Sequence, residues 1–314
     1  MRAELGFLPA PPPGQIGWPW TEASAPLPDR MPDGRPWPRV TVVTPSYNQA
    51  PYVEATLRSV LLQGYPNLEY IVIDGGSTDG SDGVIRRYEP WLAGYVTERD
   101  EGQSQAINKG LARATGEVLA WLNSDDLYEP DVLGQVAGYF AREPECALLY
   151  GLGSYIDEAG VKQGPCDWIR PFDRRLLLTF NFIMQPAAFW RRWLWEETGG
   201  LDETCHWAMD WEWLIRATAL AEPHFVPIEF ARWRVQPRMK TATGGEPRRA
   251  EIAAISRHYR GFWQPTNLVY LLDRASWRAA ERLGNGLAFR SLQRLAAPLR
   301  WLLKEKAWKG RYQD

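Results

Sequence analysis

Short apolar segments alternate with amphipathic helical segments along the first half of the chain, and this alternation most constrains the fold. The apolar runs have the length of strands and lie at Val40–Thr44, Tyr70–Ile73, Ala93–Thr97 and Val118–Leu122. The stretches between and after them place apolar side chains at helical spacing, over residues 52–62, 81–88, 103–114 and 130–140. Such alternation is typical of βαβ units in a mostly parallel sheet, and the absence of polar alternation suits a sheet covered on both faces. The sequence therefore predicts an α/β domain.

The rest of the chain is less regular. Residues 148–156 are predicted to form a hairpin around Gly151 and Gly153, residues 210–220 a helix, and residues 225–233 a strand. Residues 1–38 are rich in proline and have no apolar period, so we expect an irregular arm. Three basic helical stretches are predicted after Pro247. The expected organisation is an arm at 1–38, the α/β domain at 39–245 and a basic helical extension at 246–314.

Composition excludes several functional classes. The 314 residues include 36 basic and 38 acidic side chains, and this balance indicates no nucleic-acid partner. The 3 cysteines are too few and too widely spaced for a disulfide framework or a zinc site, and the histidines show no ligand spacing. No apolar run approaches the roughly 20 residues of a membrane span, and no signal peptide is evident. We expect a cytoplasmic protein, at most peripheral to a membrane.

The basic extension supports two hypotheses. Residues 247–314 contain 14 basic and 5 acidic side chains. Leucines at helical spacing share one face of a predicted helix there, at Leu292, Leu295, Leu299, Leu302 and Leu303. A basic amphipathic helix can lie on an anionic membrane surface. The same helix can instead pack on the catalytic domain or on a second subunit, forming a homo-oligomer.

Polar loops follow three of the predicted strands. They are Thr44–Asn48, Asp74–Gly80 and Asn123–Asp126. In sheets of this kind ligands bind beyond the carboxyl ends of the strands, so these loops should share one crevice. Adjacent carboxylates suit a hard divalent cation that also binds phosphate oxygens. Neither a G-x-G-x-x-G fingerprint nor a Walker lysine motif is present, so we expect a metal ion to hold the phosphates.

Taken in order, these segments resemble the family 2 glycosyltransferases, which have the GT-A fold. The resemblance covers roughly residues 39–236, and the residues that show it are Val42–Asn48, Ile73–Gly80, Asn108–Gly110 and Leu122–Asp126. It implies transfer of a sugar from a nucleotide diphosphate donor, with uridine as the expected base, to an acceptor hydroxyl. It also implies a divalent cation, Mn²⁺ or Mg²⁺. The acceptor class would be a glycan or a lipid-linked sugar.

The resemblance assigns donor-side residues one by one. Tyr47 would stack on the base and Asp74 would read the uracil edge. Asp125 would bind the metal, with Asp126 beside it, and Asn123 stands where an aspartate is more usual. The remaining donor contacts would come from Pro45, Asn48, Asp100, Lys109 and Ser124.

The acceptor side is assigned by the later segments. Asp210 maps to the catalytic base, while Glu212 lies on another face of the same helix and is expected to be structural. Gln185 would face the sugar. Gln236 stands near a position where many relatives have a histidine ligand, and Arg234 or Lys240 would neutralise the departing diphosphate. A loop at residues 237–245 would close over the site.

The sequence thus predicts a metal-dependent, inverting glycosyltransferase active in polysaccharide, glycan or glycolipid assembly. Two alternatives remain open. A sugar nucleotidyltransferase uses a similar sheet but usually opens with a glycine- and arginine-rich phosphate loop. A catalytically silent nucleotide-sugar-binding scaffold would not need the carboxylates Asp125, Asp126 and Asp210.

Overall fold

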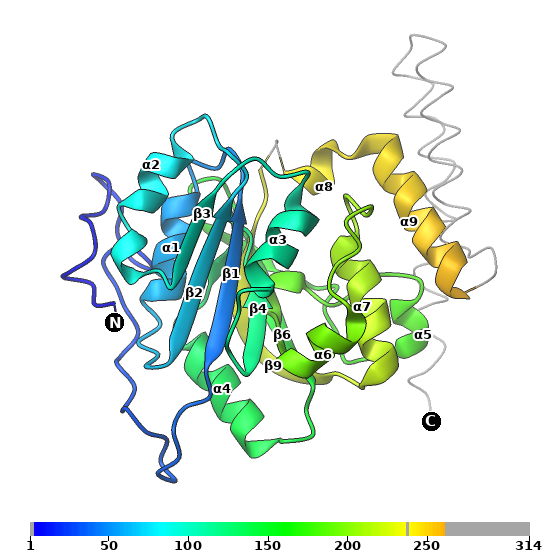
Figure 1. Cartoon of the computed structure of the whole chain (residues 1–314), viewed down its shortest axis with the longest axis horizontal. Coiled ribbons are helices and arrows are strands. Elements are labelled where there is room, and N and C mark those ends of the chain that lie inside the picture. The colour runs from blue at the N-terminus through cyan, green and yellow to red at the C-terminus, as the bar shows by residue number, and fades with distance from the viewer. Residues whose placement is uncertain (1–2, 237–238, 261–314) are drawn as a thin grey trace. The chain divides into compact units, whose positions relative to one another are not determined.

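A computed structural model describes residues 3–236 and 239–260 (Figure 1). The chain divides into two compact units. One comprises Met1–Phe172 with Phe182–Pro237, and the other Asp173–Asn181 with Arg238–Asp314. Apart from Lys240, every predicted site residue belongs to the first unit. The expected division at residues 38 and 245 stays a prediction.

The strands of the first unit form one mixed sheet. Within the described residues it has nine strands, in the order β3-β2-β1-β4-β8-β6-β9-β5, with β7 paired to β6. The strands are β1 (Val40–Ser46), β2 (Leu68–Asp74), β3 (Gly94–Thr97), β4 (Val118–Trp121), β5 (Leu127–Tyr128), β6 (Leu148–Ile156), β7 (Lys162–Pro165), β8 (Ala188–Arg191) and β9 (His224–Arg234). The first four are parallel, whereas β8 runs antiparallel to β4 and β6. The predicted parallel sheet is therefore confirmed for the first half of the domain, and the second half is mixed.

Helices cover this sheet as the alternation predicted. The first unit contains α1 (Val53–Leu61), α2 (Ser81–Arg86), α3 (Gln103–Leu111), α4 (Val132–Arg142), α6 (Arg192–Thr198), α7 (Met209–Leu220) and the 3₁₀ turns η1 (Glu89–Trp91) and η2 (Gln185–Ala187). The second unit contains α5 (Arg174–Leu177), α8 (Lys240–Thr243) and α9 (Gly245–Arg260). The basic helices predicted beyond residue 260 lie outside the described residues. Among the described helices, none is long and apolar enough to cross a membrane.

Close packing of α3 on the sheet positions the loops at its carboxyl edge. Every residue of β1 is buried, as are six of the seven residues of β2. Gly110 of α3 faces these strands, and a Cβ atom there would collide with Val43 and lie 3.2 Å from Ile73 Cγ1. The missing side chain lets the helix approach the strands closely, and this contact helps to hold the loop before α3 at the carboxyl edge.

The hairpin predicted around Gly151 and Gly153 is wrong, because both glycines lie inside the continuous strand β6. A Cβ atom at Gly151 would lie 2.5 Å from the ring of Phe230, and one at Gly153 would collide with Met184. Glycine inside a strand often marks a close approach of neighbouring groups, and that is its role here.

The proline-rich segment before β1 is irregular and is tied to α1 through Arg58. This side chain is fully buried, and its guanidinium donates hydrogen bonds to the carbonyls of Pro9 (2.9 Å), Pro19 (3.0 Å) and Trp20 (2.7 Å). A buried guanidinium requires acceptors, and carbonyls of the proline-rich segment provide them.

Candidate active site

The loops after β1 and β2 are joined by reciprocal hydrogen bonds. Asn48 has a positive φ of 52°, a conformation that asparagine tolerates better than most residues. Its backbone N–H donates to Ser77 Oγ (2.8 Å), and its side-chain oxygen accepts from the backbone N–H of Thr78 (2.9 Å). Tyr47 just before it is 61% exposed. The two loops thus form a fixed frame that presents the tyrosine to solvent.

Asp74, for which a base contact is predicted, lies within a dense set of hydrogen bonds. Its side chain has no exposed surface. Its oxygens accept hydrogen bonds from Gly76 N (3.1 Å), Ser77 N (2.9 Å), Ser77 Oγ (2.6 Å) and Thr97 Oγ1 (3.0 Å). Because it is enclosed by its own loop, the carboxylate organises the turn. Its contact with the base stays a prediction.

Asp100 and Lys109 flank the same edge of the sheet. Asp100 follows β3, and its carboxylate lies directly against the backbone of Gly75. Burial raises the pKa of Asp100, against a hydrogen bond from Gly102 that lowers it. Lys109 forms an ion pair of 2.5 Å with Glu98. The lysine is therefore compensated by a neighbouring carboxylate, while Asp100 keeps capacity to accept a hydrogen bond.

Three amide side chains connect the β4 loop to its surroundings. Asn123 accepts a hydrogen bond from Gln103 Nε2 (2.7 Å) and donates to Gln185 Oε1 (3.4 Å) and to Asp126 Oδ2 (3.1 Å). Gln185 in turn donates to the carbonyl of Trp121 (2.7 Å). These bonds fix the loop between α3 and η2, and Ser124 is buried within it.

Two adjacent carboxylates follow Asn123 in unequal environments. Asp126 is buried, and its Oδ1 accepts the backbone N–H of Arg234 (3.0 Å). Burial, and then the neighbouring Asp125, raise the pKa of Asp126. Asp125 is half-buried and accepts a side-chain hydrogen bond from Gln236 Nε2 (3.3 Å). Burial raises the pKa of Asp125, and the hydrogen bond from Gln236 and the charge of Arg234 oppose this shift.

The diphosphate contact predicted for Arg234 is not favoured by its position. The side chain is buried, and its guanidinium donates to the carbonyls of Asp125 (2.8 Å), Asp157 (2.8 Å) and Glu158 (2.9 Å). It also lies over the ring of Tyr52, 4.9 Å from the centroid. These contacts use the guanidinium to connect the β4 loop to the end of β6. The diphosphate contact of Arg234 stays a prediction.

These groups fit a divalent cation in one specific way. No cluster of three or more His, Cys, Asp or Glu residues suited to a metal exists among the described residues. A protein cage is not required, however, because such cations also bind through one or two carboxylates with phosphate oxygens and water. Asp125 provides a half-buried carboxylate, and the amide of Gln236 lies beside it. The fit is to an ion shared with a phosphorylated ligand.

Helix α7 carries Asp210 in its first turn. Four tryptophans place this helix. Trp213, one turn after Asp210, packs on Trp121 at the end of β4 (ring centroids 5.9 Å apart) and on Trp190 (4.6 Å) and Trp195 (5.5 Å). Trp121 also precedes Asn123 by two residues. One apolar cluster therefore positions both Asp210 and the β4 loop.

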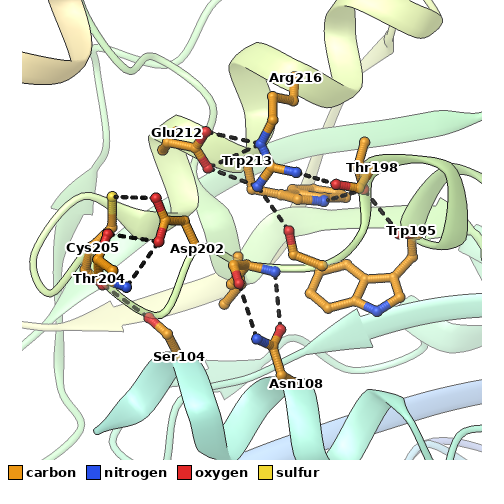
Figure 2. Close-up of polar contacts among 12 residues, drawn as sticks. Ser104, Asn108, Trp195, Thr198, Asp202, Thr204, Cys205, Glu212, Trp213 and Arg216 are labelled. Atoms are coloured by element: carbon orange, nitrogen blue, oxygen red, sulfur yellow. Dashed lines mark hydrogen bonds and ion pairs between the residues drawn. The ribbon is translucent and has the colours of Figure 1, made fainter.

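Glu212 is structural, as its position on the helix suggested. It forms a 2.7 Å ion pair with Arg216, which also donates to the carbonyls of Gly200 (2.7 Å) and Thr198 (Figure 2). Asn108 of α3 reaches the same segment, because it donates to the carbonyl of Leu201 (3.0 Å). Neither the role of Arg216 nor the tryptophan cluster was predicted from the sequence. The spacing of Glu212 and Arg216, one helical turn apart, was the available signal for the ion pair.

Comparison with known proteins decides the family. The profile described as "Glycosyl transferase family 2" matches residues 41–196. An uncharacterized glycosyltransferase of Mycobacterium tuberculosis is 33% identical over 190 residues, which are 59% of this chain and 71% of that protein. The chain belongs to glycosyl transferase family 2. It is therefore a glycosyltransferase, as the motifs predicted.

Other family members extend this comparison. The putative teichuronic acid biosynthesis glycosyltransferase TuaG of Bacillus subtilis is 39% identical over 127 residues, 40% of this chain and 50% of that protein. Two solved structures share the fold. TarS of S. aureus with UDP-GlcNAc has a TM-score of 0.58 at 17% identity, covering 76% of this chain and 72% of that one. The mannosyltransferase PcManGT of Pyrobaculum calidifontis, with GDP-Man and Mn²⁺, has a TM-score of 0.53 at 24% identity, covering 91% and 84%.

Proposed function

We propose that this family 2 glycosyltransferase uses a nucleoside diphosphate sugar and a divalent cation to glycosylate an acceptor hydroxyl with inversion. The observation that supports this most is Asp125, a partly buried carboxylate after β4 that lies beside Asp126 and accepts a hydrogen bond from Gln236 Nε2 (3.3 Å). Similar structures bind UDP-GlcNAc or GDP-Man, the latter with Mn²⁺. Uridine is the first base to test.

The donor would lie along the carboxyl edge of the sheet. Tyr47 offers an exposed ring for the base. Pro45 and Asn48 shape the loop that presents this ring, and Asn123 and Ser124 would line the ribose and diphosphate side. Lys109 would contact the nucleotide, either with its ion pair to Glu98 intact or after that ion pair has opened. Gln185 is hydrogen-bonded to Asn123 and would orient this amide toward the donor.

Asp125 would hold the cation, and the side-chain oxygen of Gln236 is the second candidate ligand. When bound, such an ion neutralises negative charge on the diphosphate as it leaves. Asp126 would fix the loop without binding the ion, because its oxygens accept from Arg234 N and Asn123 Nδ2.

Asp210 would act as the general base. The acceptor oxygen forms a bond to C1 of the sugar while the bond from C1 to the diphosphate oxygen breaks on the opposite side. The electron pair of that bond leaves with the nucleoside diphosphate, and the acceptor proton passes to the Asp210 carboxylate. The tryptophan cluster would keep this carboxylate at a fixed position relative to the β4 loop.

The acceptor would be a glycan or a lipid-linked sugar. Relatives carry names such as TuaG of teichuronic acid biosynthesis and "PGL/p-HBAD biosynthesis glycosyltransferase" of Mycobacterium bovis. Contact of the basic extension with a membrane or with a second copy also remains a proposal, as does closure of residues 237–245.

The deciding experiment identifies the product of the donor. Purified protein is incubated with UDP-glucose, UDP-GlcNAc and GDP-mannose, each with Mn²⁺ or with a chelator, and nucleotides are separated by chromatography. Slow release of UDP or GDP that requires the cation supports the proposal. Formation of UTP or GTP from added pyrophosphate would instead indicate a nucleotidyltransferase. Donor binding with no turnover, with or without an acceptor extract, would indicate a silent binding protein.

A further inference from the structure

The order of the strands separates the nucleotide side of the sheet edge from the acceptor side. In the order β3-β2-β1-β4-β8-β6-β9-β5, Tyr47 follows β1, on one side of β4, and Asp125 follows β4 itself. A nucleotide with its diphosphate near Asp125 and its base on Tyr47 therefore extends away from β6 and β9. The acceptor must approach from the other side, where β6 and β9 end.

Two aromatic residues at these strand ends share one face of the sheet. Ile156 of β6 belongs to an apolar cluster with Ala55 of α1, so it faces that helix. Its partner in register on β9 is Arg234, and Tyr155 and Trp233 form the preceding pair. Because successive side chains of a strand point to opposite faces, Tyr155 and Trp233 both face away from α1.

Two hydrogen bonds place the end of β9 next to the candidate active site. The backbone N–H of Arg234, the residue after Trp233, donates to Asp126 Oδ1 (3.0 Å). Gln236, three residues after Trp233, donates to Asp125 Oδ2 (3.3 Å). The aromatic pair is therefore connected to the loop after β4 through a few residues of β9.

A third aromatic residue completes a cluster, and we call Tyr155, Trp168 and Trp233 together the aromatic platform. The rings of Tyr155 and Trp233 have centroids 5.7 Å apart and an interplanar angle of 36°. Trp168 lies edge-on to Trp233 (6.1 Å, 85°), and its indole N–H donates to the Tyr155 hydroxyl (2.6 Å). These contacts fix the orientation of the Trp233 ring.

The aromatic platform is only partly covered by the protein. All three of its side chains are half-buried, and Val235, which continues the alternation after Trp233, is 47% exposed. Within residues 3–236 and 239–260, the indole N–H of Trp233 has no hydrogen-bond acceptor, and it is not a buried atom. An accessible apolar surface with an available donor is typical of a ligand-binding surface.

A sugar ring fits this surface better than a hydrocarbon chain. A pyranose has C–H bonds on its faces and hydroxyl groups around its rim. One face can therefore pack on the indole while a hydroxyl oxygen accepts the N–H of Trp233. A hydrocarbon chain would bury that N–H without an acceptor, which costs free energy.

We propose that Trp233, held by Tyr155 and Trp168, stacks on a sugar ring of the acceptor, so that the aromatic platform is a carbohydrate-binding subsite. Val235 extends the apolar contact toward the reacting hydroxyl. The inference rests on the proposed function, and it selects a glycan as the part of the acceptor that the enzyme recognises.

Binding of defined sugars tests the subsite without turnover. The probes are the methyl glycosides of β-glucose, β-galactose, α-mannose and β-GlcNAc, together with cellobiose and maltose. Each is added to the full-length protein with Mg²⁺ and UDP or GDP, and binding is followed by saturation-transfer NMR. We expect binding of at least one probe, with the strongest saturation at the C–H groups of one ring face.

Substitutions of Trp233 should weaken this binding in a graded way. Trp233→Ala should lower the affinity about fivefold to tenfold, the scale of one aromatic contact. Trp233→Phe keeps a ring but removes the N–H, so the affinity should fall only about threefold.

Two further variants separate the subsite from general damage. Trp193→Ala removes a tryptophan of α6 that is 43% exposed, and it should keep the wild-type affinity. Val235→Ser keeps the platform and removes an apolar contact, so it should weaken binding about threefold. Val235→Ser and Trp233→Phe decide the question if Trp233→Ala does not fold.

Specific outcomes would overturn the inference. Failure of every probe to bind the wild-type protein would do so, as would equal affinities of the wild type and the Trp233 variants. Saturation confined to the alkyl chain of n-octyl β-glucoside, and lost in Trp233→Ala, would assign the surface to a lipid instead. Cation-dependent release of UDP or GDP by the wild-type protein is measured separately. Release without sugar binding would leave the proposed function intact and remove the subsite, whereas sugar binding without release would do the reverse.

Discussion

The loop after β2 and the loop after β4 both contain two carboxylates, but they satisfy them differently. In the β2 loop, Asp74 accepts four hydrogen bonds, and Asp79 accepts from Ser81 N (3.0 Å), Ser81 Oγ (2.5 Å) and Ala50 N (2.9 Å). Burial pulls the pKa of Asp79 upward, but these hydrogen bonds outweigh it and lower the pKa. In the β4 loop, burial raises the pKa of Asp125 and of Asp126.

The β2 loop compensates its carboxylates with hydrogen-bond donors from the protein. The β4 loop would gain part of this compensation from a bound ligand. A buried carboxylate with several N–H and O–H donors stabilises the fold, and its removal exposes those donors to an apolar environment. A buried carboxylate without enough donors destabilises the fold and gains its compensation on binding a cation. The two loops should therefore respond to mutation in opposite ways.

The largest expected effect is on turnover in Asp125→Ala. Donor turnover should fall about a thousandfold or more, because several kcal/mol of charge stabilisation at the diphosphate are lost. The melting temperature without metal should not fall, since a costly buried charge is removed. Turnover and thermal unfolding are measured on the same preparation, with the exposed Asp167→Ala as control. Turnover near the wild-type rate would remove Asp125 from the cation site.

Asp210→Asn extends the comparison to α7. Sugar transfer should fall about a hundredfold or more, the usual range for loss of a general base, while the affinity for UDP or GDP stays the same. Steady-state kinetics and calorimetry together test this. Glu212→Gln is the matched control on the same helix, and it should lower stability through Arg216. A parallel loss of nucleotide affinity in Asp210→Asn would place this residue on the donor side.

Asp74→Ala should show the reverse pattern to Asp125→Ala. The free energy of unfolding should fall by about 3 kcal/mol or more, because buried N–H and O–H donors lose their acceptor. Nucleotide affinity should weaken for all bases alike, since the whole loop is loosened. Urea unfolding gives the first quantity and calorimetry the second. Unchanged stability combined with a loss of affinity for UDP alone would instead support Asp74 as the base-reading residue.

The smallest expected effect concerns pH and Glu129, which follows β5. Burial raises its pKa, but hydrogen bonds from Arg232 (2.7 Å) and Lys162 outweigh this and lower it below 4.5. The stabilisation is therefore present above the unfolded-state value and is lost as the pH falls from about 4.5 through the folded-state value.

Glu129→Gln should remove this pH dependence. Over that acidic range the wild-type free energy of unfolding should fall by about 1 kcal/mol more than that of the variant, the scale of one charged hydrogen bond. Urea unfolding at a series of pH values measures it, with the exposed Glu145→Gln as control. Parallel curves for wild type and Glu129→Gln would contradict the prediction.

Prediction from sequence succeeded where the signal is local. The strand and helix segments of residues 40–140 were placed within a few residues of β1–β4 and α1–α4, because apolar period and chain length are read along the chain. The family followed from ordered motifs at the strand ends. The antiparallel position of β8 between β4 and β6 was not predicted, since no local pattern encodes which distant strands pair.

The α/β domain, the family and the set of residues at the carboxyl edge of the sheet could all be predicted from local patterns and ordered motifs. The chemical environment of each of these residues depends on how distant segments fold together. Asp74 and Asp100 are both acidic residues after strands, yet one is enclosed by four hydrogen bonds and the other keeps an available oxygen beside Gly75. Likewise Arg234 is committed to three carbonyls. The physical reason is that the capacity of a polar group depends on donors and acceptors from distant segments.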